Sequence, residues 1–125
     1  MPTPLLISIV DDDESVRIAI DSLVRSVGYG SAVFSSPQDF LLSAARDSSS
    51  CLITDVQMPG MSGLELQDRL NEQGSRIPII FITAFPEKPL EKRALEAGAT
   101  AFLTKPFSGQ SMLEHIARAL SYRAV

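Results

Sequence analysis

The sequence has a single cysteine, Cys51, and no long hydrophobic run. One cysteine excludes an internal disulfide framework and a cysteine-rich zinc site. No apolar run approaches the ~20 residues of a membrane span, and the Met-Pro-Thr-Pro start lacks the basic residues of a signal peptide. Basic residues are also scarce, with 11 Lys and Arg against 15 Asp and Glu. Because nucleic-acid affinity arises mainly from neutralised phosphates, we expect no nucleic-acid binding by this chain itself. From the missing membrane span and signal peptide, we expect no membrane association and a cytoplasmic location.

The 125 residues are 45% hydrophobic, which suits one domain with its own core and argues against intrinsic disorder. We therefore expect one domain over residues 1–125. Five short apolar segments predict buried strands, because the strands of a parallel sheet are apolar on both faces. These segments are Leu5–Val10, Ala32–Phe34, Cys51–Thr54, Ile77–Thr83 and Ala101–Thr104.

Amphipathic segments with helical spacing alternate with the apolar ones. A Ser-Pro pair starts the second of them, and Gly28, Gly74 and Gly98 end three others. The apolar stripes of the first and fourth segments include Val27 and Leu95. The predicted helices fall within residues 16–27, 36–44, 62–73, 90–97 and about 109–122.

Five alternations of strand and helix specify a parallel sheet with helices on both faces. An eight-fold barrel needs about 250 residues, so the expected fold is an open, doubly wound α/β sheet. Such sheets bind ligands at the carboxyl ends of their strands. The residues that follow the strands at this edge are Asp11, Asp12, Asp13, Asp55, Thr83, Ala84, Lys105 and Pro106.

Three of these carboxylates, on Asp11, Asp12 and Asp55, would lie within a few ångströms of one another. Two like charges 4 Å apart repel by about 4 kcal/mol at an effective dielectric constant near 20. We expect Lys105 and a Mg²⁺ ion to offset this repulsion. An ionised Asp55 would then be a nucleophile toward a phosphoryl group, and the Thr83 hydroxyl would donate a hydrogen bond to a phosphate oxygen.

Each of these residues alone has a simpler explanation. Asp12 or Asp13 could be a helix N-cap, and Asp55 could be a turn residue. Thr83 suits a strand, and Lys105 suits a solvated surface. The convergence of complementary groups at one edge of the sheet favours a functional site over these explanations.

The strand-end motifs resemble the receiver domain of two-component response regulators, and the similarity extends from Leu5 to about Tyr122. It implies a flavodoxin-like, or CheY-like, fold with the strand order 2-1-3-4-5. The second motif is most similar to the FixJ-like subfamily, which usually carries a LuxR-type helix-turn-helix output domain. The motifs are Val10-Asp11-Asp12-Asp13, Asp55-Val56-Gln57-Met58-Pro59-Gly60-Met61-Ser62-Gly63, Thr83-Ala84 and Lys105-Pro106-Phe107.

The resemblance implies a role for each residue of the acidic cluster. Asp55 matches the phosphoacceptor. Asp12 matches the direct Mg²⁺ ligand, Asp11 matches its partner, and the backbone carbonyl of Gln57 would be a further ligand. Lys105 matches the residue that pairs with the phosphoryl group.

The remaining motif residues match the switch of the family. Thr83, which Ala84 follows, matches the hydroxyl that turns toward the phosphoryl group. Phe102 matches the aromatic residue that turns inward when Thr83 moves. Pro106 implies a cis peptide bond that aims Lys105 into the site.

The resemblance also implies the partners. A sensor histidine kinase would supply the phosphoryl group, and the face formed by the fourth helix, fifth strand and fifth helix would change shape. This change would promote a homodimer and control a C-terminal output domain that regulates transcription. Phe85, two residues after Thr83, is bulky and apolar, so we expect it to screen the phosphoryl group from water and prolong its lifetime.

Besides an input domain, the same residues are compatible with a stand-alone receiver, a phosphate-independent binding module or a phosphohydrolase of the haloacid-dehalogenase type. The hydrolase needs a second Asp two positions after its nucleophile as general acid, where this sequence has Gln57. A phosphoacceptor switch, and not an enzyme, is therefore expected. The binding module is disfavoured because every key position is kept: Asp11, Asp12, Asp55, Thr83 and Lys105.

Overall fold

The computed structural model contains one sheet of five parallel strands in the order β2-β1-β3-β4-β5. This confirms the predicted doubly wound fold, and the strand limits differ from prediction by at most two residues. The structure describes residues 4–124, with side chains for residues 4–121, so residues 1–3 and 125 of the predicted domain lie outside it. The strands are β1 Leu6–Val10, β2 Gly30–Phe34, β3 Cys51–Asp55, β4 Ile79–Thr83 and β5 Ala101–Thr104.

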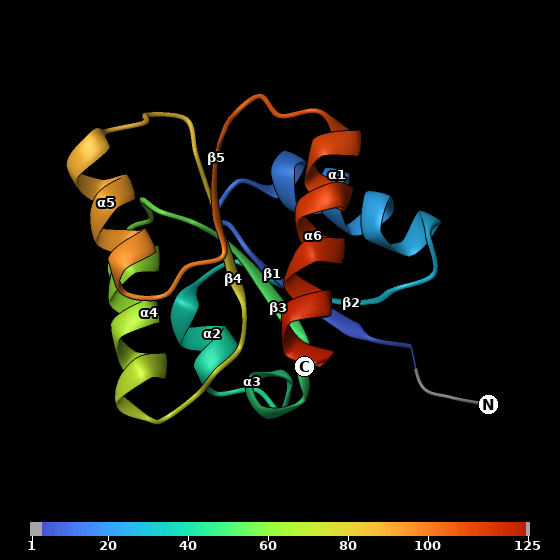
Figure 1. Ribbon diagram of the computed structural model, residues 1–125, viewed down its shortest axis with the longest axis horizontal. Coiled ribbons are helices and arrows are strands. Elements are labelled where there is room, and N and C mark those ends of the chain that lie inside the picture. The colour runs from blue at the N-terminus through green and yellow to red at the C-terminus, as the bar shows by residue number, and fades with distance from the viewer. Residues whose placement is uncertain (1–3, 125) are drawn as a thin grey trace.

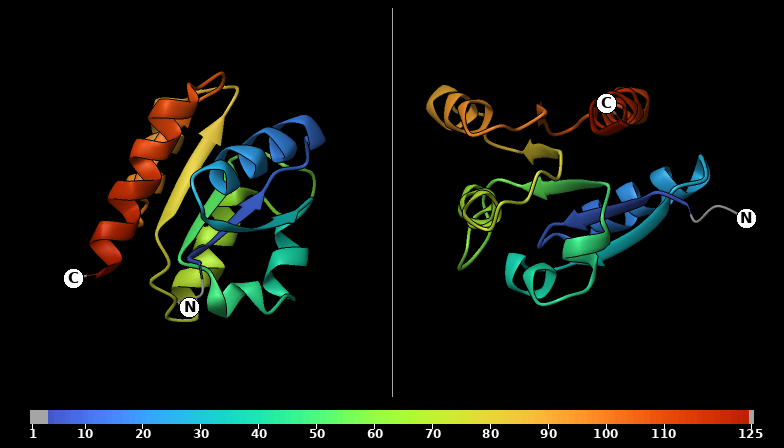
Figure 2. Two further views of the ribbon diagram at one scale, coloured as in Figure 1. Left: turned by 90° about the vertical axis from the view of Figure 1, so that its right-hand side faces the viewer. Right: turned by 60° about the horizontal axis from the view of Figure 1, so that its bottom comes forward.

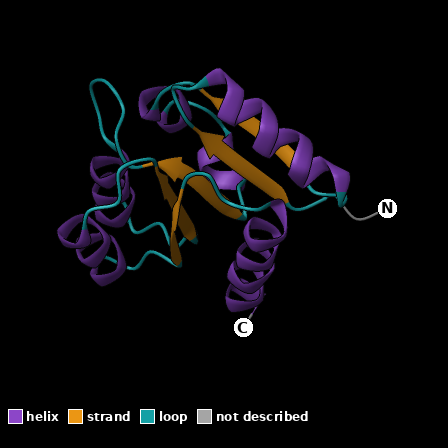
Figure 3. Ribbon diagram, turned by 90° about the horizontal axis from the view of Figure 1, so that it is seen from above, coloured by secondary structure: helices purple, strands orange, loops and turns teal. Residues whose placement is uncertain are grey.

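Helices cover both faces of the sheet (Figures 1, 2 and 3). One core cluster packs α1 and α6 against one face, and a second packs α2, α4 and α5 against the other. Every residue of β3 and β4 is buried, which explains why these strands read as continuous apolar runs. The helices are α1 Glu14–Ser26, α2 Pro37–Leu41, α3 Ala45–Ser48, α4 Gly63–Glu72, α5 Lys88–Glu96 and α6 Gly109–Ala124.

The second predicted helix, 36–44, is shorter than expected, because α2 ends at Leu41, and α3 is a further short helix just after the predicted range. The Ser43 hydroxyl donates to the Phe40 carbonyl at 2.9 Å and accepts from the Ala45 amide at 3.1 Å. Such side-chain bonds compete with the helical ladder and divide α2 from α3. The helices of residues 4–124 include none that is long and apolar enough to cross a membrane.

Val27 and Leu95, both assigned to apolar stripes, are exposed instead. Val27 is 53% exposed because it is the C-cap of α1, where the chain turns at Gly28 with a φ of 97°. Leu95 is 44% exposed because its neighbour Ala94 occupies the side of α5 that faces the core. Because successive residues of a helix are rotated by about 100° from each other, Leu95 cannot face the core when Ala94 does.

The start of α4 packs directly against the end of β3. The Gly63 amide donates to the Val56 carbonyl at 2.9 Å, and Ser62 and Glu65 form a reciprocal capping box. A Cβ atom on Gly63 would lie 2.1 Å from the Asp55 carbonyl oxygen. Only glycine permits this approach, so Gly63 fixes the position of the Asp55 main chain.

We expect Gly63→Ala to lower the free energy of unfolding by about 1–3 kcal/mol, as overpacking of a tight contact does. Gly30→Ala is the matched control, because its Cβ would meet nothing closer than 3.7 Å. Chemical denaturation monitored by circular dichroism measures both. Equal unfolding midpoints for the two variants would contradict the close approach.

Candidate functional site

The parallel register brings the carboxyl ends of four strands to one edge. Asp55 pairs with Ile82 across β3 and β4, and Thr83 pairs with Thr104 across β4 and β5. Pairing continues past the last strand, where the Lys105 amide donates to the Thr83 carbonyl at 2.8 Å. The backbone of this edge is therefore held by the same ladder as the sheet.

The structure brings the predicted acidic residues together. Asp11, Asp12 and Asp55 offer carboxylate oxygens that all lie within 4.8 Å of one another. Asp11 and Asp55 are buried, whereas Asp12 is exposed. Lys105 reaches both buried groups, with Nζ 3.0 Å from Asp11 Oδ2 and 2.9 Å from Asp55 Oδ2. The Lys105–Pro106 peptide bond is cis, as the resemblance implied.

Backbone amides orient two of the carboxylates. Asp11 Oδ1 accepts from the Asp13 amide at 2.8 Å, and Asp55 Oδ1 accepts from the Gln57 amide at 3.1 Å. Asp13 is itself the N-cap of α1, since its Oδ1 accepts from the Ser15 amide at 2.9 Å. Capping thus accounts for Asp13 and leaves Asp11 and Asp12 to the cluster.

Burial and neighbouring charges shift two pKa values at the site. Burial raises the pKa of Asp11, and the charge of Asp55 adds to this, although bonds from the Asp13 amide and Lys105 act in the opposite direction. Burial alone would lower the pKa of Lys105, but its hydrogen bonds with Asp55 and Asp11 outweigh that effect and raise it. Lys105 therefore stays charged, and the charge of Asp11 is unfavourable.

The donor set fits a hard divalent cation. Three carboxylates with one ammonium group leave a net charge of about −2 when all are ionised. Carboxylate and carbonyl oxygens suit Mg²⁺ and related ions. The carboxylates of Asp11, Asp12 and Asp55 lie close enough together to hold such an ion, and the Gln57 carbonyl stays a ligand predicted from the resemblance.

Thr83 and the residues after it form the other wall of the edge. Thr83 is 1% exposed, and its Oγ1 accepts from the Phe85 amide at 3.1 Å. Ala84 and Phe85 are exposed, and Phe85 exposes 67% of its surface. Phe102 is half-buried beside Phe81, with ring centroids 6.2 Å apart. The Thr83 hydroxyl therefore links the site to the loop before α5.

Sequence reasoning missed Arg17. Its Nη1 donates to the Asp11 carbonyl oxygen at 2.7 Å and so fixes the main chain at the start of the acidic cluster. Its place in the first turns of α1, beside the β1–α1 loop, is the only signal in the sequence.

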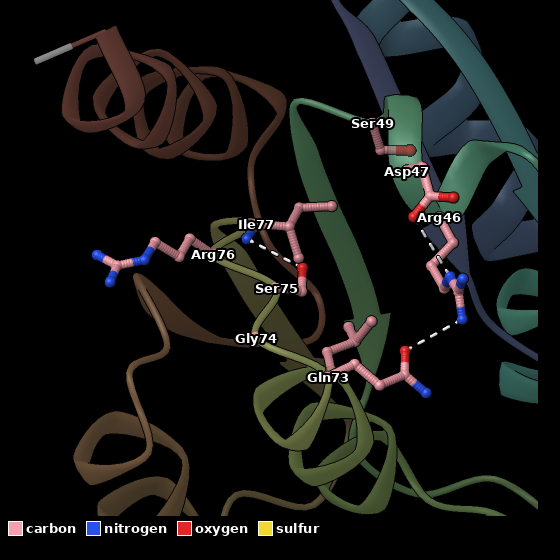
Figure 4. A pocket seen from close by; sticks show the side chains of 9 residues that line it. Arg46, Asp47, Ser49, Gln73, Gly74, Ser75, Arg76 and Ile77 are labelled. Atoms are coloured by element: carbon pink, nitrogen blue, oxygen red, sulfur yellow. Dashed lines mark hydrogen bonds and ion pairs between the residues drawn. The ribbon is translucent and has the colours of Figure 1, made fainter.

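A hollow of about 520 Å³ lies at the opposite edge of the sheet, before β3 and β4 (Figure 4). Arg46 there is bound to Asp47 at 3.5 Å and to Gln73 Oε1 at 3.1 Å, and Arg76 points away from the hollow (Figure 4). The polar groups of this hollow do not converge on a common point, whereas the polar groups at the carboxyl ends of the strands do. The candidate site is therefore the acidic edge.

We expect Asp11→Asn to raise the free energy of unfolding without metal by about 1 kcal/mol, because Lys105 keeps Asp55 as a partner while one buried charge is removed. Thermal unfolding in EDTA measures this. Added Mg²⁺ should stabilise the wild type more than the variant. Asp47→Asn, at an exposed side chain, is the matched control and should change little. A less stable Asp11→Asn would contradict the unfavourable charge.

The raised pKa of Asp11 gives this effect a pH dependence. In the unfolded chain the carboxyl titrates near its ordinary value of 3.8, below its pKa in the folded chain. Above the pKa of the folded chain, Asp11 is ionised in the folded and the unfolded chain, so the buried charge lowers the free energy of unfolding by its full amount. Below 3.8, Asp11 is protonated in both chains, and this destabilisation vanishes. The stability advantage of Asp11→Asn should shrink as the pH falls through this interval, and a constant difference would contradict the shift.

Comparison with known proteins assigns the family. The model of the response regulator receiver domain matches residues 7–117. The response regulator protein TodT of Pseudomonas putida is 47% identical over 115 residues, which are 92% of this chain and 51% of TodT. The transcriptional regulatory protein FixJ of Azorhizobium caulinodans is 35% identical over 124 residues, which are 99% of this chain and 59% of FixJ.

A solved structure with a similar fold supports the same family. The solved structure of the response regulator StyR superposes with a TM-score of 0.90 and 41% identity, over 98% of this chain and 62% of the StyR chain. The chain spans about half the length of the curated relatives it matches. The family model covers residues 7–117, which is most of the chain, so the chain belongs to the family of response regulator receiver domains.

Proposed function

We propose that the chain is a phosphorylation-activated signalling switch that accepts a phosphoryl group on Asp55 from a sensor histidine kinase in the cytoplasm. The observation that carries this proposal is the position of Lys105 Nζ, 2.9 Å from Asp55 Oδ2 and 3.0 Å from Asp11 Oδ2. A partly buried ammonium group beside a carboxylate at a strand end is placed to neutralise a phosphoryl group built on that carboxylate.

The transfer is a displacement at phosphorus. An Asp55 oxygen forms a bond to phosphorus while the phosphorus–nitrogen bond of the kinase phosphohistidine breaks, and its electron pair stays on the imidazole nitrogen. Lys105 offsets the charge that gathers on the phosphoryl oxygens. Mg²⁺ held by Asp11, Asp12, Asp55 and the Gln57 carbonyl would supply further charge neutralisation when bound.

The readout of phosphorylation passes through Thr83. Its hydroxyl accepts from the Phe85 amide in this structure and has a proton free to donate. A phosphoryl group on Asp55 adds acceptor oxygens and negative charge, which draw the Thr83 hydroxyl and Ala84 toward it. Phe102 then occupies the space that Thr83 leaves, and Pro106 keeps Lys105 aimed at the phosphoryl group.

The changed surface is the α5–β5–α6 face, where the helices predicted as fourth and fifth are α5 and α6. Phosphorylation biases an equilibrium between two shapes of this face, because the phosphoryl group interacts differently with each. The longer relatives include a transcriptional regulatory protein, so we infer that the face controls homodimer formation and a helix-turn-helix output domain in a longer protein. A stand-alone receiver would use the same chemistry. Whether it is part of a longer regulator or a stand-alone receiver, the chain acts as a phosphoacceptor and not as a multiple-turnover enzyme.

Incubation with acetyl phosphate and Mg²⁺ tests the phosphoacceptor. We expect intact-mass measurement to show one phosphoryl adduct on the wild type. The adduct should be absent without Mg²⁺ and absent from Asp55→Asn. Exposed Asp39→Asn is the matched control and should be modified normally. An unmodified wild type, with a second small phosphodonor as well, would favour a phosphate-independent binding module.

Phe85 is proposed to prolong the phosphoryl lifetime by limiting the access of water to Asp55. We expect Phe85→Ala to accelerate loss of the phosphoryl group several-fold, measured as decay of the adduct by mass. Leu42→Ala changes a side chain that is 88% exposed and lies between α2 and α3, and it should leave the decay unchanged. Equal decay for Phe85→Ala and the wild type would contradict this role.

A further inference from the structure

Two amide side chains join α4 to α5, which lie side by side (Figure 1). Gln67 Nε2 donates to the Ala94 carbonyl oxygen at 3.0 Å, and Asn71 Nδ2 donates to the Ala97 carbonyl oxygen at 3.0 Å. The donors are one helical turn apart on α4, and the acceptors are nearly one turn apart on α5. Gln67 and Asn71, called here the amide clamp, therefore hold the two helices parallel in a fixed register.

The amide clamp acts on the carboxyl end of α5. The last carbonyls of a helix have no donor within the helix, and Asn71 supplies one to Ala97, the C-cap residue. Gln67 is 2% exposed, so its bond is shielded from water. The nearby pair of Arg93 and Asp68 is close, at 2.7 Å, but its side chains are 52% and 47% exposed, where ion pairs contribute little.

Among the described residues, no side-chain hydrogen bond attaches the amino end of α5, and only Leu90 packs against the core there. Its N-cap residue, Glu87, makes no side-chain cap bond, and residues 84–89 are all exposed. Within α5 only Ala94 is fully buried. The loop before the helix is held to β4 by the bond from the Phe85 amide to Thr83 Oγ1.

We propose that the amide clamp is a pivot for α5. Its carboxyl end stays fixed to α4, while its amino end moves with residues 84–87 when Thr83 turns toward a phosphoryl group. This inference rests on the proposed function. It assigns Gln67 and Asn71 as positioning residues, which convert the movement of one hydroxyl group into a tilt of α5 within the α5–β5–α6 face.

The second polar atom of Gln67 supports this assignment. Gln67 Oε1 is buried and has no hydrogen-bond partner among the described residues. A buried acceptor without a partner destabilises the fold, and an apolar side chain of the same size avoids that penalty. The favourable polar contribution of Gln67 is therefore its Nε2 bond to the Ala94 carbonyl of α5, which is the bond that the amide clamp requires.

Hydrogen exchange measured by mass spectrometry, with Mg²⁺ and with or without beryllofluoride as a phosphoryl mimic, tests the pivot. In the wild type we expect beryllofluoride to change exchange in residues 84–90 and to leave residues 94–98 unchanged. Gln67→Met and Asn71→Ala should each speed exchange in residues 94–98 by about tenfold, the effect of one lost hydrogen bond on local opening. Gln110→Met, which alters an exposed amide on α6, is the matched control.

The outcomes separate the pivot from the function on which it rests. An acetyl phosphate adduct on Asp55 together with the expected exchange pattern supports both. An adduct with equal changes at both ends of α5, or with clamp variants that exchange like the wild type, overturns the pivot alone. Absence of the adduct overturns the proposed function and the pivot with it. Asn71 is exposed, so Asn71→Ala provides the test even if Gln67→Met fails to fold.

Discussion

One ammonium group, Lys105 Nζ, holds the acidic edge of this protein together. It lies within 3.0 Å of carboxylates that follow β1 and end β3, and so it joins the first, third and fifth strands by charge as well as by the sheet. Without it, desolvation and mutual repulsion would make two ionised carboxylates this close together unfavourable. The geometry of the site depends on this contact.

The fold could be predicted from the sequence because the apolar runs, the helical spacing and the order of the segments all indicate the same architecture. β3 and β4 are buried on both faces and therefore read as apolar runs, and the alternation of strands and helices leaves few topologies. The break between α2 and α3 could not be predicted, since it depends on two bonds of the Ser43 hydroxyl that leave no periodic signal.

The composition of the site could also be predicted, because residues that follow parallel strands must meet at one edge. Asp11, Asp12, Asp55 and Lys105 do meet there, while their chemical roles stay predictions. The contact of Arg17 with the Asp11 carbonyl was missed because it depends on the direction in which α1 leaves the sheet. The amide clamp was missed for a similar reason, since its donors and acceptors are 26 and 27 residues apart.

The contacts between α4 and α5 bear on how such domains can be recombined. The Ala94 and Ala97 carbonyls at the end of α5 accept side-chain hydrogen bonds from Gln67 and Asn71 of α4, so the two helices form one exchangeable module. A chimera that borrows α5, β5 and α6 from a relative without the matching α4 would lose both side-chain hydrogen bonds that join the last turn of α5 to α4. Swapping the segment from Ser62 onward keeps these donors and acceptors together and leaves the Ser62–Glu65 capping box of α4 intact.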